Sequence, residues 1–203
     1  MQENLETDQK ILRAARKIFV QKGLTGTRMQ DIADEAGINK ALLHYYYRSK
    51  KLLFEIVFKE HKQKMFENLI QILNSDKSVM EKVEQVIEHE QDSLQAFPTM
   101  PLFIMNEVHQ NPERVFELHT GAMKEVTWQF FKQIEQEIAE GKIRAINPMD
   151  LLINLVSLNT FPYLACPMFM HTLGMSEKDV EEFLQNRRHT IKEFFRQALS
   201  LEK

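Results

Sequence analysis

The sequence is poor in the residues that interrupt helices or build covalent frameworks. Six glycines and six prolines among 203 residues favour long helices over a turn-rich sheet structure. The single cysteine, Cys166, excludes an internal disulfide framework and suits a reducing compartment. Because its neighbours are apolar, we interpret it as a packed residue rather than a nucleophile.

Long apolar runs are also lacking. We find no run that approaches the length needed to span a bilayer, and the first ten residues lack the apolar core of a signal peptide. We therefore expect a cytoplasmic protein without a membrane contact. An apolar content of 43% with 27% charged residues is ordinary for soluble globular chains and argues against wholesale disorder.

The net charge of −3 hides an uneven distribution. Residues 1–52 contain ten Lys and Arg against six Asp and Glu, whereas the remainder contains sixteen against twenty-three. A basic N-terminal segment on an acidic body is expected when one end of a protein meets phosphate.

Two short helices separated by a tight turn are predicted between residues 27 and 51. Thr27 and Gln30 have the spacing of a capping box at the first helix. Gly37 follows the last apolar residue of that helix, where a left-handed residue ends it, and Asn39 can cap the next. This pattern predicts a helix-turn-helix, whose second helix can enter the DNA major groove.

The periodicity elsewhere predicts an all-α chain of about nine helices, with a domain boundary after Ser49. Capping residues and apolar spacing place the helices at residues 7–22, 28–36, 40–46, 50–74, 79–96, 102–109, 112–140, 148–165 and 176–200. Pro162 is expected to kink or end the eighth helix, and Pro167 to prevent much extension.

Residues 27–53, TRMQDIADEAGINKALLHYYYRSKKLL, resemble the DNA-binding domain of the TetR/AcrR family of bacterial transcriptional regulators. The resemblance covers residues 8–55, and beyond them it rests on the helical layout and the total length. It implies a three-helix helix-turn-helix DNA-binding domain at residues 1–49. It further implies a helical effector-binding and dimerisation domain at residues 50–203, connected through helix 50–74.

The resemblance also implies roles for individual residues. Thr27 would bind a phosphate through its hydroxyl and backbone N–H, and Tyr46 and Lys50 would hold further phosphates. Lysine at the start of the second helix can donate to guanine, whereas alanine and leucine offer only apolar contact. The implied DNA-contacting residues are Thr27, Arg28, Lys40, Ala41, Leu42, His44, Tyr45, Tyr46 and Lys50.

Three of the neighbouring positions have other readings. Leu43 and Tyr47 are expected to pack in the core, because the family places packing residues there. His44 stands where the family usually has tyrosine, so its phosphate contact would involve a shorter, titratable ring.

The apolar character of helices 148–165 and 176–200 predicts a homodimer. Both helices are too apolar for the surface of a small bundle, and pairing with their copies around a two-fold axis would cover them. A dimer also suits double-stranded DNA with a pseudo-palindromic operator, because two recognition helices would lie about one turn apart.

The family resemblance further implies a small, largely apolar effector that releases a repressor from its operator. Fourteen Phe and eleven Met supply candidates for its pocket, although residues at such spacing are more often core. The candidate pocket residues are Phe103, Met105, His109, Trp128, Phe131 and Phe161.

Two other functions remain open from the sequence. The helical body could dock a protein partner instead of a small ligand. A helical-pocket enzyme using Glu107, His109 or His119 as acid or base is less favoured, because no nucleophile–base grouping supports it. We predict no catalytic residue, no cofactor and no metal site, since Glu107 and His109 would point to different sides of a helix.

Overall fold

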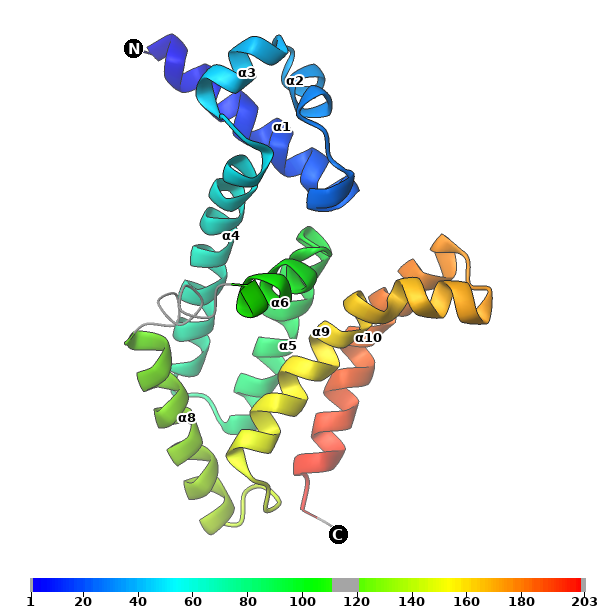
Figure 1. Ribbon diagram of the computed structural model, residues 1–203. Coiled ribbons are helices and arrows are strands. Elements are labelled where there is room, and N and C mark those ends of the chain that lie inside the picture. Colours follow the sequence, from blue (N-terminus) through cyan, green and yellow to red (C-terminus); the bar gives the residue numbers. More distant parts are fainter. Residues whose placement is uncertain (1, 111–120, 202–203) are drawn as a thin grey trace. The chain divides into compact units, whose positions relative to one another are not determined.

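The computed structural model describes residues 2–110 and 121–201, and the regular structure in these ranges is helical throughout (Figure 1). This confirms the all-α expectation. The helices in the described ranges are α1 (Gln2–Gly26), α2 (Met29–Ala36), α3 (Lys40–Tyr46), α4 (Lys50–Leu73), α5 (Val79–Ala96), α6 (Met100–Gln110), α8 (Ala122–Ala139), α9 (Pro148–Leu173) and α10 (Glu177–Leu199).

The chain divides into two compact units, Met1–Met65 and Phe66–Lys203. The division falls inside α4, the helix expected to connect the two domains. The assignment of DNA binding to residues 1–49, and of effector binding and dimerisation to residues 50–203, stays a prediction.

The first unit is built around the apolar faces of α1, α2, α3 and the start of α4. Phe19 and Phe54 are both buried and meet edge to face, with ring centroids 4.8 Å apart. Ile32 on α2 and Leu43 on α3 are fully buried as well. Burying such side chains contributes roughly 1.5–3 kcal/mol each, so this core fixes where α3 lies.

The start of α2 differs from its prediction. Arg28 rather than Thr27 occupies the capping position, and its backbone N–H donates to the Asp31 carboxylate at 3.0 Å. Thr27 is buried, and its hydroxyl donates to the Gly23 carbonyl at 2.6 Å. The expected Thr27 cap is wrong because α1 is interrupted at Gly23 (φ 64°, ψ 178°), and the hydroxyl satisfies a carbonyl at that point.

Two further helix starts differ from their predictions. The first helix begins at Gln2, not near residue 7. The predicted helix 112–140 is interrupted at residue 121. Gly121 has φ 44° and ψ −78°, outside the helical region, and α8 begins at Ala122. The earlier part of that helix lies outside the described residues.

The second unit has its core where α5, α8, α9 and α10 pack together. Its buried apolar members include Ile87, Phe130, Leu151, Ile191 and Phe195.

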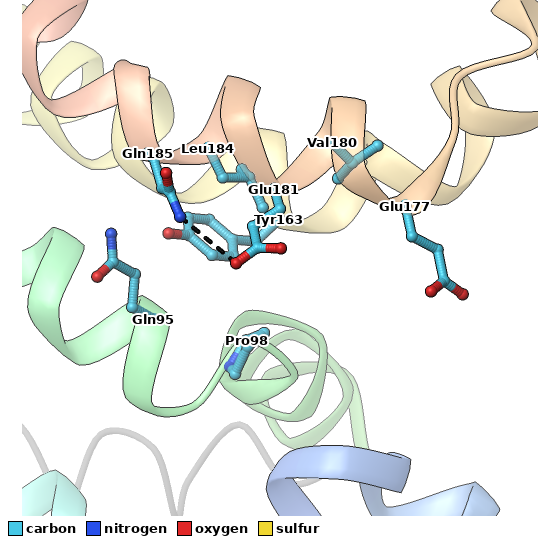
Figure 2. Close-up of a pocket in the computed structure, with 8 residues that line it drawn as sticks. All are labelled: Gln95, Pro98, Tyr163, Glu177, Val180, Glu181, Leu184 and Gln185. Carbon is cyan, nitrogen blue, oxygen red and sulfur yellow. Dashed lines mark hydrogen bonds between the residues drawn. The ribbon is translucent and has the colours of Figure 1, made fainter.

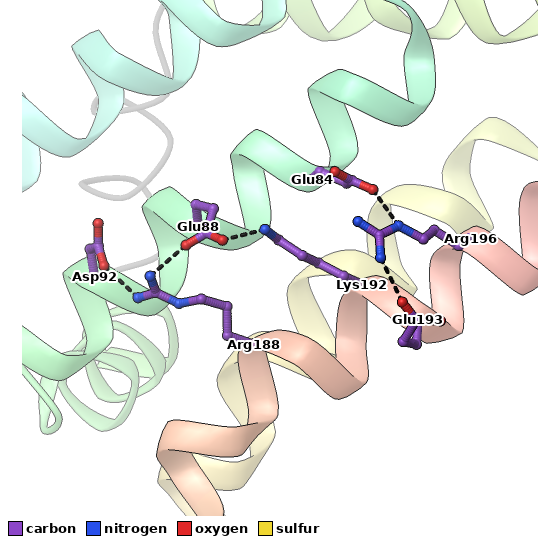
Figure 3. Close-up of polar contacts among 7 residues, drawn as sticks. All are labelled: Glu84, Glu88, Asp92, Arg188, Lys192, Glu193 and Arg196. Carbon is purple, nitrogen blue, oxygen red and sulfur yellow. Dashed lines mark hydrogen bonds and ion pairs between the residues drawn. The ribbon is translucent and has the colours of Figure 1, made fainter.

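Charged side chains join α5 to α10 along one side of this core (Figure 3). Arg188 pairs with Glu88 at 2.5 Å and also with Asp92, and Lys192 pairs with Glu88. One turn further on, Arg196 pairs with Glu84 at 2.6 Å. Because the acids lie on α5 and the bases lie on α10, these ion pairs fix the register of α10 against α5.

α9 is longer than predicted. It continues through Pro162 and Pro167 and ends only at Gly174, which is left-handed (φ 64°). The expected stop near residue 165 is wrong: Pro162, Ala165 and Cys166 are buried, so packing supports the helix through the first proline, and mostly exposed residues continue it after Pro167. Helix packing can thus outweigh the missing proline N–H and the ring clash.

The length of α9 also corrects the expectation about apolar runs. Within the described residues, α9 is long and apolar enough to cross a membrane by length and composition alone. It contributes Leu151 and Leu155 to the core of the second unit and packs against α5, α8 and α10. A core helix of a soluble bundle has the same composition.

Candidate nucleic-acid interface and apolar cavity

The turn between α2 and α3 has the geometry that its residues predict. Gly37 is left-handed (φ 67°, ψ 33°), a conformation that glycine adopts without a Cβ clash. The Asn39 side chain accepts a hydrogen bond from the Leu42 backbone N–H at 2.8 Å and so caps α3. With Leu43 fully buried, these contacts set which face of α3 turns outward.

The outward face of α3 carries most of the expected DNA contacts. Lys40, Ala41, His44 and Tyr45 are exposed. Tyr45 is 78% exposed, and its ring lies edge to face with Tyr46 at 5.6 Å. So exposed an aromatic ring next to a lysine and a histidine suits a surface that contacts DNA bases and phosphates.

Tyr47 packs inward, as expected. It is 6% exposed, and its hydroxyl donates to the Asp8 carboxylate at 2.6 Å, which ties α1 to the end of α3.

Lys50 lies beside the start of α2. Its ammonium donates to the Thr27 carbonyl at 2.8 Å and to the Thr25 carbonyl at 3.4 Å. The Arg28 backbone N–H lowers the pKa of Asp31, and Lys22, at 3.0 Å, lowers it further. Lys50 and the N-terminus of α2 therefore form a locally positive region, with Asp31 as its counter-charge.

The predicted DNA-contacting residues thus fall into two groups. Those on α3 comprise the exposed Lys40, Ala41, His44 and Tyr45 and the half-buried Leu42 and Tyr46, and Arg28 and Lys50 lie together at the start of α2 and α4. The Thr27 hydroxyl already serves the fold, so its phosphate contact stays a prediction, as do the other assigned contacts.

The basic residues of α1 border a shallow recess of about 250 Å³. Lys10, Arg13 and Lys17 line it together with Glu35 of α2, and Lys17 pairs with Glu35 at 2.6 Å. Glu35 therefore neutralises part of the positive charge of α1 within the unit.

The second unit encloses an apolar cavity of about 90 Å³. Four helices contribute to it: α4, α5, α8 and α9. The lining residues are Leu69, Leu73, Val86, Glu90, Met123, Thr127, Phe130, Leu152, Leu155 and Val156.

Glu90 is the one titratable residue among the described residues of this lining. Its side chain keeps some exposed surface, but burial of the carboxyl raises the pKa of Glu90 to about 7. The sequence could have revealed it, because Glu90 continues the buried stripe of Val83, Val86 and Ile87 along α5.

The described residues among the six predicted for a pocket do not line this cavity. Trp128 and Phe161 are more than half exposed, and Met105 and His109 are exposed too. Phe131 is buried against Trp128, and the Phe103 side chain lies outside the described residues. None of the five described side chains lines the apolar cavity, and their ligand contact stays a prediction.

A second groove of about 410 Å³, with a mixed polar and apolar lining, runs between the end of α5 and the helices α9 and α10 (Figure 2). Gln95, Tyr163, Glu181 and Gln185 line it. Burial raises the pKa of Tyr163 to about 12, and its hydroxyl donates to Gln91 at 3.4 Å. Tyr163 therefore belongs to the packing between α5 and α9 and does not offer a reactive phenolate.

Metal-binding and nucleophilic groups are not gathered in the described parts of the chain. No three His, Cys, Asp or Glu side chains lie close enough there to share a metal ion. Cys166 is buried, and this burial raises the pKa of its thiol, as expected for a packed residue.

Comparison with known proteins agrees with the geometry of the first unit. Residues 11–57 match the family described as bacterial regulatory proteins, tetR family. The HTH-type transcriptional repressor KstR2 of Mycolicibacterium smegmatis is 26% identical over 165 residues, which cover 74% of each chain.

Solved structures share the fold over nearly the whole chain. A transcriptional regulator from Saccharomonospora viridis, solved in complex with choline, is similar at a TM-score of 0.67 and 19% identity, covering 97% of this chain and 99% of that one. A TetR transcription regulator from Haloarcula marismortui reaches a TM-score of 0.62 at 18% identity, covering 96% and 99%. At these identities the likeness shows the fold.

Proposed function

The chain belongs to the TetR family of bacterial regulatory proteins, and from this premise we propose that it is a homodimeric repressor released from its operator by a small, largely apolar ligand. That it is a DNA-binding transcriptional regulator and not an enzyme follows from the family and its curated relatives. The dimer, the operator symmetry and the ligand are the proposed parts.

The outward face of α3 is the observation that carries the DNA-binding role. Leu43 anchors the helix in the core, whereas Lys40, His44 and Tyr45 are exposed to solvent. An α-helix presented in this way fits the major groove of B-DNA, where side chains can reach base edges.

The exposed apolar surface of α9 and α10 supports a homodimer. Ile153 and Phe161 on α9 and Phe194 on α10 are each at least half exposed. Apolar surface of this extent on a soluble protein marks an interaction site, and a second copy would cover it symmetrically.

The apolar cavity supports a small-molecule effector. It lies among four helices of the second unit, and its lining offers mainly Leu, Val, Met and Phe side chains. The Saccharomonospora viridis regulator, whose fold is similar, was solved in complex with choline, so a chain of this fold can bind a small molecule. For release, the ligand must bind the DNA-free state more tightly than the DNA-bound state.

A binding titration with DNA from upstream of its own gene tests the proposal. We expect saturable binding that weakens as salt rises, because phosphate contacts release counterions. No binding even at low salt would refute the operator role.

A thermal-stability screen of metabolites tests the ligand. We expect at least one compound to raise the melting temperature and to displace operator DNA. A body that responds only to a protein partner would show neither effect.

A further inference from the structure

The apolar cavity contains a carboxyl group that the described part of the chain leaves without a partner. Its described lining residues from α4, α8 and α9 carry no titratable group, and among the described lining residues Glu90 on α5 is the only acid. Within the described residues, no hydrogen bond or ion pair reaches the Glu90 carboxylate. A buried carboxylate without a partner is costly, so its retention in such a lining calls for an explanation.

The neighbouring carboxylates of α5 are arranged differently (Figure 3). They face α10, and each pairs with a cation of that helix; the pairs are Glu84–Arg196, Glu88–Lys192 and Asp92–Arg188. Glu90 lies on the other side of α5, toward the cavity. The described residues therefore supply partners for the acids that face α10, whereas a partner for Glu90 would have to come from the cavity.

The chemistry of the lining restricts what such a partner can be. The Thr127 hydroxyl donates to the Met123 carbonyl at 2.7 Å, so its proton is already committed. A ligand carboxylate would meet Glu90 as a like charge. A ligand hydroxyl could donate a hydrogen bond to the ionised carboxylate but would leave its charge uncompensated. An ammonium group both donates hydrogen bonds and neutralises the carboxylate.

This inference rests on the proposed function: we propose that the effector site takes a small amine. The ammonium group binds Glu90, and the hydrocarbon part lies among Leu73, Met123 and Leu155. A cavity of about 90 Å³ is smaller than the ~150 Å³ engineered cavity that binds benzene. The hydrocarbon part is therefore a short alkyl chain or a small ring.

Isothermal titration of the full-length protein without DNA tests this inference. The probes are hexylamine, hexan-1-ol and hexanoate, which share a chain and differ in the head group. We expect hexylamine to bind best, and Glu90→Gln to weaken its binding at least tenfold, because the lost contact is a charge-assisted hydrogen bond. The alcohol should bind the variant and the wild type about equally.

The pH dependence gives a second readout. Hexylamine should bind about tenfold more weakly at pH 6 than at pH 8, because a carboxyl with a pKa of about 7 is mostly protonated at the lower pH. Methyl NMR of labelled methionine locates the probe, since Met123 lines the cavity and should shift while distant methionines do not.

Glu135→Gln is the matched control, because it removes the same charge from the exposed side of α8. Equal binding of amine and alcohol, an unaffected Glu90→Gln variant, or no hexylamine binding at millimolar concentration would each overturn the inference. None of these results bears on operator binding, so the DNA titration separates failure of this inference from failure of the regulator role.

Discussion

Lys40 and Lys50 carry the same charge in different surroundings. Lys40 is exposed at the first position of α3, whereas Lys50 is held against the Thr27 carbonyl at 2.8 Å. We expect Lys40→Ala to relax sequence preference, because a free lysine at that position can donate to guanine O6 and N7. Lys50→Ala should weaken binding to all sequences alike and reduce the salt slope by about one unit, because it removes the predicted phosphate contact.

Fluorescence anisotropy with operator and scrambled DNA at several salt concentrations measures both effects. Lys59→Ala serves as the control, because it removes an exposed lysine from α4 outside the predicted contacts. If the two test variants change specificity and salt slope in the same way, the division into base and phosphate contacts is incorrect.

The raised pKa of Glu90 leads to a prediction about the stability of the protein without ligand. Its pKa rises on folding from about 4.5 to about 7, so the folded state binds the proton more tightly. The Glu90 contribution to stability is thus favourable at low pH and is lost as pH rises from about 4.5 to 7. Glu90→Gln should leave stability nearly unchanged at pH 4.5 and raise it by up to about 3 kcal/mol at pH 8.

Urea unfolding of the wild type and the variant between pH 4.5 and 8 measures this difference. The Glu135→Gln control should show no such growth with pH. A constant difference across the range would mean that the Glu90 carboxyl is as well hydrated in the folded protein as in the unfolded chain.

At the scale of helices, the starts that depend on nearby residues were predictable. Asn39 caps α3, Asn147 caps α9, and Ser176 with Asp179 caps α10, each through bonds to residues two or three positions away. Such contacts depend only on local sequence. The positions of these helices therefore follow from the sequence itself.

The features that depend on distant residues were not predictable. Pro162 stays within α9 because other helices bury it. The apolar cavity needs four helices that are far apart in the chain. Periodicity identifies Glu90 as a charge on an apolar face, but only the packed unit shows that it lacks a partner.

α10 presents two chemically different sides. One carries Arg188, Lys192 and Arg196 toward α5, and another carries Phe194, which is 50% exposed. We expect Phe194→Glu to dissociate the dimer, because it would bury a charge in an apolar interface. Sedimentation velocity measures the oligomeric state, and circular dichroism checks that the variant still folds.

Leu102→Glu is the control for this substitution. Leu102 is 57% exposed on α6, away from the proposed dimer face, so the variant should remain dimeric. A dimeric Phe194→Glu protein would show that the α9 and α10 surface is not where the two copies meet.

For the whole molecule, two copies of α3 must engage one DNA duplex. A symmetric dimer holds its recognition helices at a fixed separation, so its half-sites must face the same side of the DNA about one turn apart. Inserting five base pairs between the half-sites rotates one by about half a turn. We expect affinity to fall to roughly that of a single half-site, because only one copy of α3 can then bind. An insertion that left affinity unchanged would mean that the two first units bind independently, and that ligand release could not act through the separation of the recognition helices.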